Sequence, residues 1–131
     1  MSEQNVETAE RLIEGWNQAD WGLIESLFWP DAETQAPEGW PEAEDPKGWP
    51  AIKRQFERLK ESWSEDRFEL ETTEAVADDV VLQHGHWRTR GTKSGIDVDF
   101  EVWIIYRFRD GKIKRAEFYL DEEQAMRAAG R

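Results

Sequence analysis

The side chains best suited to chemistry alternate along one short segment, residues 80–90. Its residues divide into two interleaved sets: Gln83, Gly85, Trp87 and Thr89 form one, and His84, His86, Arg88 and Arg90 form the other. Because successive residues of a strand point to opposite faces, the basic set shares one face. Facing an apolar cavity, a histidine can act as an acid or a base, and an arginine can stabilise a carboxylate or an enolate oxygen.

The basic face also has a simpler interpretation. It can point outward, where Arg88 and Arg90 would pair across strands with Asp97, Asp99 or Glu101. At least one histidine would then be structural or exposed to solvent. The residues leave both interpretations open, and the outward one is at least as well supported.

The two histidines could instead begin a metal site. His84 and His86 are separated by one residue, and alternate residues of a strand converge on one side. Metal sites usually need a third protein ligand, and the candidates are Glu38, Glu44 and Asp121, which nothing in the sequence supports. We therefore expect no metal site and no other cofactor.

A long predicted hairpin, residues 95–123, forms the part of the sheet beside which residues 80–90 must lie. Its first strand places Ile96, Val98, Phe100, Val102, Ile104 and Tyr106 on one face. The opposite face carries Asp97, Asp99, Glu101, Trp103, Ile105 and Arg107, which we interpret as the outer surface of a sheet. Asp110 and Gly111 predict a tight two-residue turn, and residues 112–120 form the return strand.

The remaining segments supply a cover for the apolar face. Helical spacing predicts helices over residues 4–18, over a short stretch after Asp20 that Pro30 ends, and from Pro50 to about residue 63. Residues 32–36, 68–77 and 80–90 are predicted strands, residues 37–50 an irregular loop ordered by Trp40 and Trp49, and residues 121–130 a terminal helix. This order predicts one α+β domain over residues 1–131, with three N-terminal helices on a strongly curved, mostly antiparallel sheet.

Composition excludes several classes of partner. The 131 residues carry a formal net charge of −12, which disfavours binding to nucleic acid and to anionic membranes. No apolar run approaches the ~20 residues of a membrane span, and the N-terminus lacks the features of a signal peptide. We expect a cytoplasmic protein. Eight tryptophans and no cysteine indicate a dense core or an aromatic pocket without disulfides.

The stretch SGIDVDFEVWIIYRFRDGKIKRAEFYLDEEQAMRAAG, with Pro30-Asp31-Ala32 and Lys47-Gly48 as lesser matches, resembles the SnoaL-like branch of the nuclear transport factor 2-like superfamily. Relatives include ketosteroid isomerases, limonene-epoxide hydrolases and polyketide cyclases. The resemblance implies a cone-shaped fold with an apolar cavity, and a homodimer through the outer face of the sheet. An outer patch of Trp103 and Ile105 is compatible with such a dimer.

The catalytic acids that the resemblance implies are missing here. The isomerase base would stand at Ala36, and the key aspartate of the epoxide hydrolases at Phe118. Asp121 closes the last strand, where the cyclases have an acid, although it could simply cap the terminal helix. If the protein is an enzyme, we expect His84 or His86 as base, Arg88 as anion stabiliser and Asp121 as secondary acid.

Two functions remain after these comparisons. The first is binding or scaffolding around a hydrophobic small molecule, which the missing acids slightly favour. The second is acid–base isomerisation, cyclisation or hydrolysis of such a molecule. Both need the predicted pocket, whose lining we expect to be Trp16, Trp40, Phe56, Phe100, Val102, Ile104, Tyr106 and Phe118.

Overall fold

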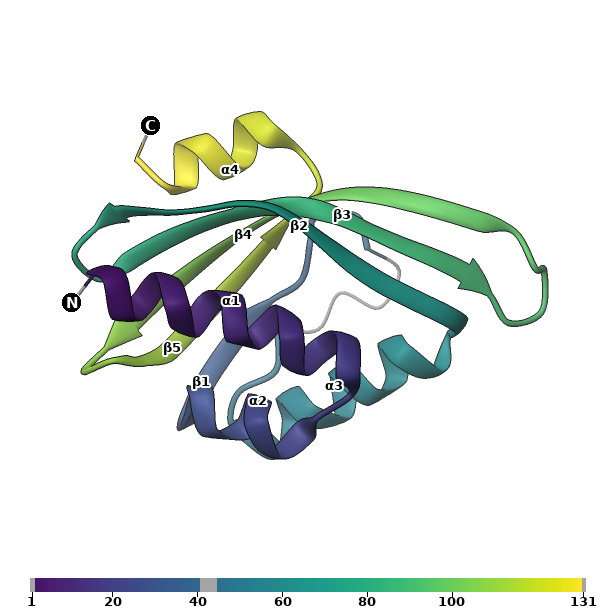
Figure 1. Cartoon of the computed structure of the whole chain (residues 1–131), viewed down its shortest axis with the longest axis horizontal. Coiled ribbons are helices and arrows are strands. Elements are labelled where there is room, and N and C mark those ends of the chain that lie inside the picture. Colours follow the sequence, from purple (N-terminus) through teal and green to yellow (C-terminus); the bar gives the residue numbers. More distant parts are fainter. Residues whose placement is uncertain (1, 41–44, 131) are drawn as a thin grey trace.

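A computed structural model of the chain describes residues 2–40 and 45–130. Four helices and five strands follow one another along these residues (Figure 1). Their order is α1 (Ser2–Gln18), α2 (Trp21–Leu27), β1 (Phe28–Gln35), α3 (Trp49–Glu61), β2 (Trp63–Ala77), β3 (Val80–Gly91), β4 (Asp97–Arg109), β5 (Lys112–Tyr119) and α4 (Glu122–Ala128).

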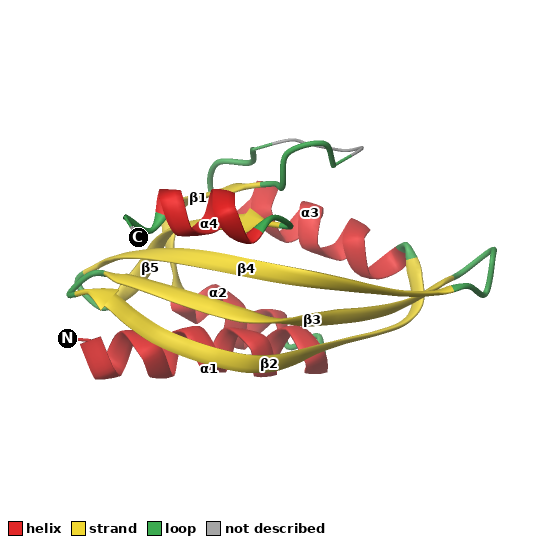
Figure 2. Cartoon of the chain, turned by 90° about the horizontal axis from the view of Figure 1, so that it is seen from above, coloured by secondary structure: helices red, strands yellow, loops and turns green. Residues whose placement is uncertain are grey.

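The five strands form one curved sheet in the order β1-β5-β4-β3-β2. All neighbours are antiparallel except β1 and β5, which run parallel. Helices α1, α2 and α3 lie on one side of this sheet and α4 lies on the other (Figures 1 and 2). The α+β class, the curved and mostly antiparallel sheet, and the terminal helix are confirmed.

The boundaries of several predicted elements were wrong. The second helix ends at Leu27, and β1 begins at Phe28 rather than at residue 32, so Pro30 lies inside a strand. Proline is tolerated there because β1 is an edge strand, where one N–H group needs no partner. Helix α3 ends at Glu61, and β2 begins at Trp63 rather than at residue 68. Part of the predicted loop, residues 41–44, lies outside the described residues.

Helix α4 changes the interpretation of the outer face. The side chains of Leu82, Trp103 and Ile105 are buried in one cluster with Ala125 of α4. The patch that was compatible with a dimer contact is therefore covered within the monomer. At the far end of the sheet the β3–β4 hairpin extends past the helices (Figure 1). Ile96, in the connection between these two strands, is 63% exposed.

Gly85 lies in β3 where the neighbouring strand comes unusually close. A Cβ atom there would lie 2.4 Å from the carbonyl oxygen of Glu69 and 2.6 Å from the ring of Phe68. The adjacent strand β2 has a bulge at this point, between Leu70 and Thr72. Glycine is therefore required at this position by packing.

We expect Gly85→Ala to lower the free energy of unfolding by about 1–3 kcal/mol, because the extra methyl group overpacks the β2–β3 contact. Urea denaturation followed by circular dichroism measures the change. Gly22→Ala in α2 is the matched control, since the nearest atom to its added Cβ is 3.7 Å away, at Asp20. An unchanged midpoint for Gly85→Ala would contradict the close approach of the two strands.

Candidate functional site

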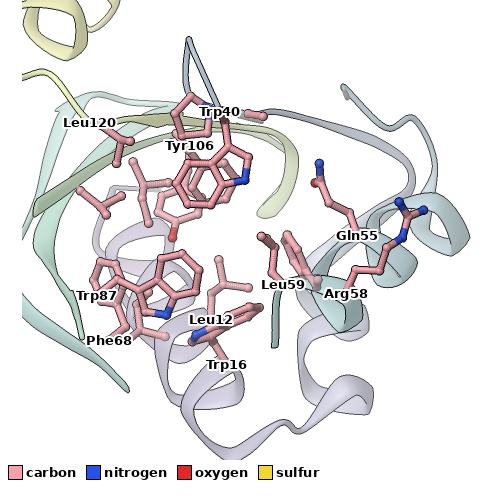
Figure 3. Close-up of a pocket in the computed structure, with 17 residues that line it drawn as sticks. Leu12, Trp16, Trp40, Gln55, Arg58, Leu59, Phe68, Trp87, Tyr106 and Leu120 are labelled. Atoms are coloured by element: carbon pink, nitrogen blue, oxygen red, sulfur yellow. The ribbon is translucent and has the colours of Figure 1, made fainter. Parts of the chain in front are cut away.

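An apolar pocket of about 120 Å³ lies between the sheet and the helices on its concave side (Figure 3). Three indole rings, those of Trp16, Trp40 and Trp87, stand around it. The residues that line it are Leu12, Ile13, Trp16, Ala36, Pro37, Trp40, Gln55, Phe56, Arg58, Leu59, Phe68, Trp87, Val102, Ile104, Tyr106, Phe118 and Leu120.

Helical and strand periodicity explain how these side chains converge. Leu12 and Trp16 are four residues apart on α1 and therefore share a face. Phe56 and Leu59 do the same on α3, three residues apart. From the sheet, alternate residues of β4 point toward the helices, with Val102 as an example.

Seven of the eight residues expected from the sequence line this pocket. The exception is Phe100, which packs behind the lining with its ring centroid 5.5 Å from Trp40 and 5.6 Å from Trp87. Trp87 and Phe68 were not expected in the lining. Their signal in the sequence was alternation, since Trp87 lies on the opposite face of β3 from the histidines.

Asp66 holds two of the three pocket tryptophans, Trp16 and Trp87. Its carboxylate accepts hydrogen bonds from the indole N–H groups of Trp16 at 2.9 Å and Trp87 at 3.1 Å. Lys60 donates to the same carboxylate at 3.0 Å, and its ammonium lies 4.3 Å from the centre of the Trp16 ring. Asp66 thus holds two walls of the pocket in place. Sequence reasoning missed it because no local pattern marks a carboxylate on the inner face of β2.

The hydroxyl of Tyr106 is a fully buried polar group in the pocket lining. It donates a 2.7 Å hydrogen bond to Oε1 of Gln83, whose amide donates in turn to Thr73. Burial raises the pKa of Tyr106 far above its ordinary value. This hydroxyl is therefore a neutral group engaged in a buried network.

Gln55 and Arg58 form the polar edge of the pocket, side by side on α3 (Figure 3). Gln55 accepts a hydrogen bond from the hydroxyl of Thr34. Arg58 is exposed and makes no ion pair with any residue that the structure describes. A cation at the rim of an apolar pocket can attract a ligand that carries an anionic or strongly polar group.

The residues expected to be catalytic lie elsewhere. His84, His86 and Arg88 point to the outer face of the sheet, opposite the pocket, and pair with residues of the neighbouring strands. For example, Nε of Arg88 lies 3.0 Å from Glu69. The interpretation that placed this row inside the cavity is wrong. These basic side chains point outward, as the alternative interpretation expected, and Arg88 and Arg90 pair with Asp99 and Asp97.

Asp121 is also outside the pocket lining, which ends at Leu120. It is exposed and occupies the N-cap position of α4, although its side chain makes no capping hydrogen bond.

On the outer face of the sheet, the hydrogen bond with Asp99 raises the pKa of His86, and the charges of Glu71 and Glu101 add to this effect.

Among the described residues, no helix combines the length and the apolar character that a bilayer crossing demands.

The sequence profile of the SnoaL-like domain matches residues 9–116. The chain belongs to the SnoaL-like domain family. Ala36 and Phe118, the two positions at which the resemblance implied a catalytic acid, both line the pocket.

Solved structures show the same fold. Bal32a, from a soil-derived mobile gene cassette, is 24% identical with a TM-score of 0.84, covering 99% of this chain and 98% of its own. An NTF2-like protein of unknown function from Burkholderia pseudomallei is 17% identical with a TM-score of 0.82, covering 97% of each chain. TerC, co-crystallised with polyporic acid, is 21% identical with a TM-score of 0.80, covering 98% of this chain and 99% of its own. No curated protein matches the sequence.

Proposed function

We propose that this SnoaL-like domain binds a small, mainly apolar molecule in the pocket between the sheet and the helices. One observation carries the proposal. The pocket is lined almost entirely by apolar side chains, among them Ala36 and Phe118, at the two positions where the resemblance implied a catalytic acid. No lining residue within the described parts of the chain carries a carboxylate or an imidazole. The site can hold an apolar molecule but has no evident proton acceptor.

The lining also suggests which molecules fit. Three indole rings favour a flat, ring-containing ligand, because aromatic faces and edges stack on such rings. Arg58 and Gln55 at the rim favour a polar or anionic substituent on the same molecule. The fold relative TerC, co-crystallised with polyporic acid, supports a small-molecule role for a pocket of this fold.

An acid–base enzyme is the alternative, and the pocket supports it less well. Of the ionisable groups in the lining, Tyr106 has a pKa raised by burial, so it stays protonated near neutral pH. Arg58 carries a guanidinium, which does not lose its proton in proteins. Neither group can accept a proton from a substrate at pH 7.

Ligand screening tests the proposal directly. We expect at least one compound among steroids, terpenes, polyketide-like aromatics and fatty acids to raise the melting temperature at pH 7. A ligand at a hundred times its dissociation constant adds about 2.7 kcal/mol of stability. The emission of Trp16, Trp40 and Trp87 should change in the same titration. Turnover of a stabilising compound by the purified protein would instead favour the enzyme.

We expect Ala36→Phe to weaken binding of such a ligand at least about tenfold, because the added ring fills part of a small pocket. Ala36→Ser is the matched control, since it changes polarity with little change in volume. A second pair of variants tests the rim of the pocket. Arg58→Ala should weaken the binding of anionic ligands. Arg54→Ala, on the same helix but outside the lining, should leave that binding unchanged. Equal affinity of wild type and Ala36→Phe would place the ligand elsewhere.

The homodimer through the outer sheet face also remains a proposal. Trp103 and Ile105 no longer support it, because α4 covers them. Sedimentation velocity measures the oligomeric state.

A further inference from the structure

Three side chains with metal-binding atoms meet on the outer face of the sheet. Nδ1 of His84 lies 3.3 Å from one carboxylate oxygen of Glu71, and Nε2 of His86 lies 3.2 Å from the other. Each of the three residues offers one ligand atom, and these three atoms all lie within 4.8 Å of one another. This cluster, Glu71, His84 and His86, is separate from the pocket, which lies on the other side of β3.

The spacing fits tetrahedral coordination. Bonds of about 2.0–2.1 Å from a zinc ion to imidazole nitrogen and carboxylate oxygen place neighbouring ligand atoms about 3.3 Å apart. Nδ1 of His84 and Nε2 of His86 already lie about this far from Glu71, each from a different carboxylate oxygen. Two histidines and one glutamate are a known zinc ligand set, and the half-exposed Glu71 leaves a fourth position open to solvent.

The second ring nitrogen of each histidine is held by another carboxylate. Nε2 of His84 lies 2.8 Å from Glu101, and Nδ1 of His86 lies 3.0 Å from Asp99. Carboxylates in this position fix the tautomer, so that the other nitrogen presents its lone pair to a metal. In addition, the ring of His84 stacks on the buried indole of Trp103 at 4.9 Å. The imidazoles are thus oriented before any ion binds.

Backbone geometry explains why Glu71 belongs to the cluster. Leu70 pairs with Gly85 and Thr72 pairs with His84, so Glu71 is the extra residue of the β2 bulge. Bulges commonly redirect one side chain. Gly85, between the two histidines, permits the close strand contact at this bulge.

We propose that Glu71, His84 and His86 form a binding site for a divalent transition metal ion, with Zn²⁺ as the best fit. The net charge of −12 attracts cations to the surface. The guanidinium of nearby Arg88 is neutralised by Glu69 and Asp99, so it does not oppose an ion in the cluster. An ion here would join β2 to β3 on the outer face.

Isothermal titration of the untagged chain with Zn²⁺ tests the site. The chain has two histidines and no cysteine, so any imidazole-bound ion must bind His84 or His86. We expect one ion per chain and a higher melting temperature with Zn²⁺. In a long-range ¹H–¹⁵N spectrum of the two imidazoles, Zn²⁺ should shift Nδ1 of His84 and Nε2 of His86.

Matched variants make the test specific. Loss of a carboxylate behind a metal-bound histidine typically costs 10–100-fold in affinity, and loss of a ligand should cost at least as much. We therefore expect about a tenfold or greater loss for Glu71→Gln, for His86→Asn and for Asp99→Asn. Glu65→Gln removes the same charge on the same strand and face, while Arg90 keeps its pair with Asp97, and this variant should bind Zn²⁺ within about twofold of wild type. Equal loss in Glu71→Gln and Glu65→Gln, or unshifted imidazole nitrogens, would overturn the proposal and leave the cluster as an ion-pair network.

Discussion

Asp66→Ala is expected to lower the free energy of unfolding by about 3–5 kcal/mol, the cost typical of removing one partner from a buried charged network. The Asp66 side chain is 9% exposed and accepts hydrogen bonds from Trp16, Trp87 and Lys60. Its removal leaves two indole N–H groups and an ammonium without their acceptor. Urea denaturation gives the loss. Tryptophan emission should change as well, because two walls of the pocket lose their anchor.

Two variants separate the parts of this network. Lys60→Met removes the ammonium but keeps the carboxylate as acceptor for both indoles, and we expect a smaller loss of about 1–3 kcal/mol. Asp66→Asn retains one carbonyl oxygen and should fall between the two. If Asp66→Ala proved no less stable than Lys60→Met, the carboxylate would not be what holds Trp16 and Trp87.

Glu117→Gln should have a comparable effect, again about 3–5 kcal/mol, because it leaves two partly buried guanidinium groups facing an uncharged amide. Nε of Arg107 donates to Glu117 at 2.8 Å, Nε of Arg115 at 2.9 Å and the hydroxyl of Tyr119 at 2.9 Å. Arg107 also donates to the carbonyl of Ala128 at the end of α4. One carboxylate thus joins β4 and β5 and supports the helix on the outer face.

The effect of Glu117→Gln should depend on pH. Burial alone would raise the pKa of Glu117, but the hydrogen bonds from Arg107, Tyr119 and Arg115 outweigh it and hold the pKa below its ordinary value of 4.5. A lowered pKa in the folded state means that the carboxylate contributes its full stability above pH 4.5. The contribution is lost as the pH falls through the folded-state pKa. Denaturation midpoints of wild type and variant should therefore differ at pH 7 and converge in acid.

Glu65→Gln is the matched control for this experiment. It also removes a carboxylate that faces an arginine, but Glu65 is 75% exposed and lies 3.8 Å from Arg90. An exposed pair of this kind contributes at most about 1 kcal/mol. A pH-independent difference between wild type and Glu117→Gln would contradict the assigned role of the Glu117 carboxylate.

The pocket and the proposed metal cluster lie on opposite faces of the same strand. In β3, Trp87 contributes to the pocket, while its neighbours His84 and His86 contribute to the cluster. Gly85 lies between the two histidines in the sequence and is packed against β2. An ion that joins β2 to β3 would therefore act next to Phe68 and Trp87, both of which line the pocket. The Zn²⁺ titration repeated with bound pocket ligand measures any coupling between the two sites.

Local patterns were sufficient for much of the fold. The β4–β5 turn was predicted from Asp110 and Gly111, and both residues have positive φ, at 48° and 82°. The helix faces were predicted from apolar spacing, which is why Trp16 and Phe56 were placed in the pocket correctly. The family resemblance added the expectation that Ala36 and Phe118 replace catalytic acids, which no spacing could suggest. These features depend on residues close together in the sequence, or on a pattern shared with relatives.

The sequence by itself determined which residues share a face: the two histidines with Arg88 on one side of β3, and Trp87 on the other. Only the tertiary structure decided which of these faces meets the helices, because alternation has two equivalent phases and a strand can be turned over without changing its pattern. Helix α4 likewise covers Trp103 by a contact between segments. The position of Glu71 beside both histidines depends on the register and bulge of β2 against β3, which arise from pairing between strands and leave no signal in either strand alone.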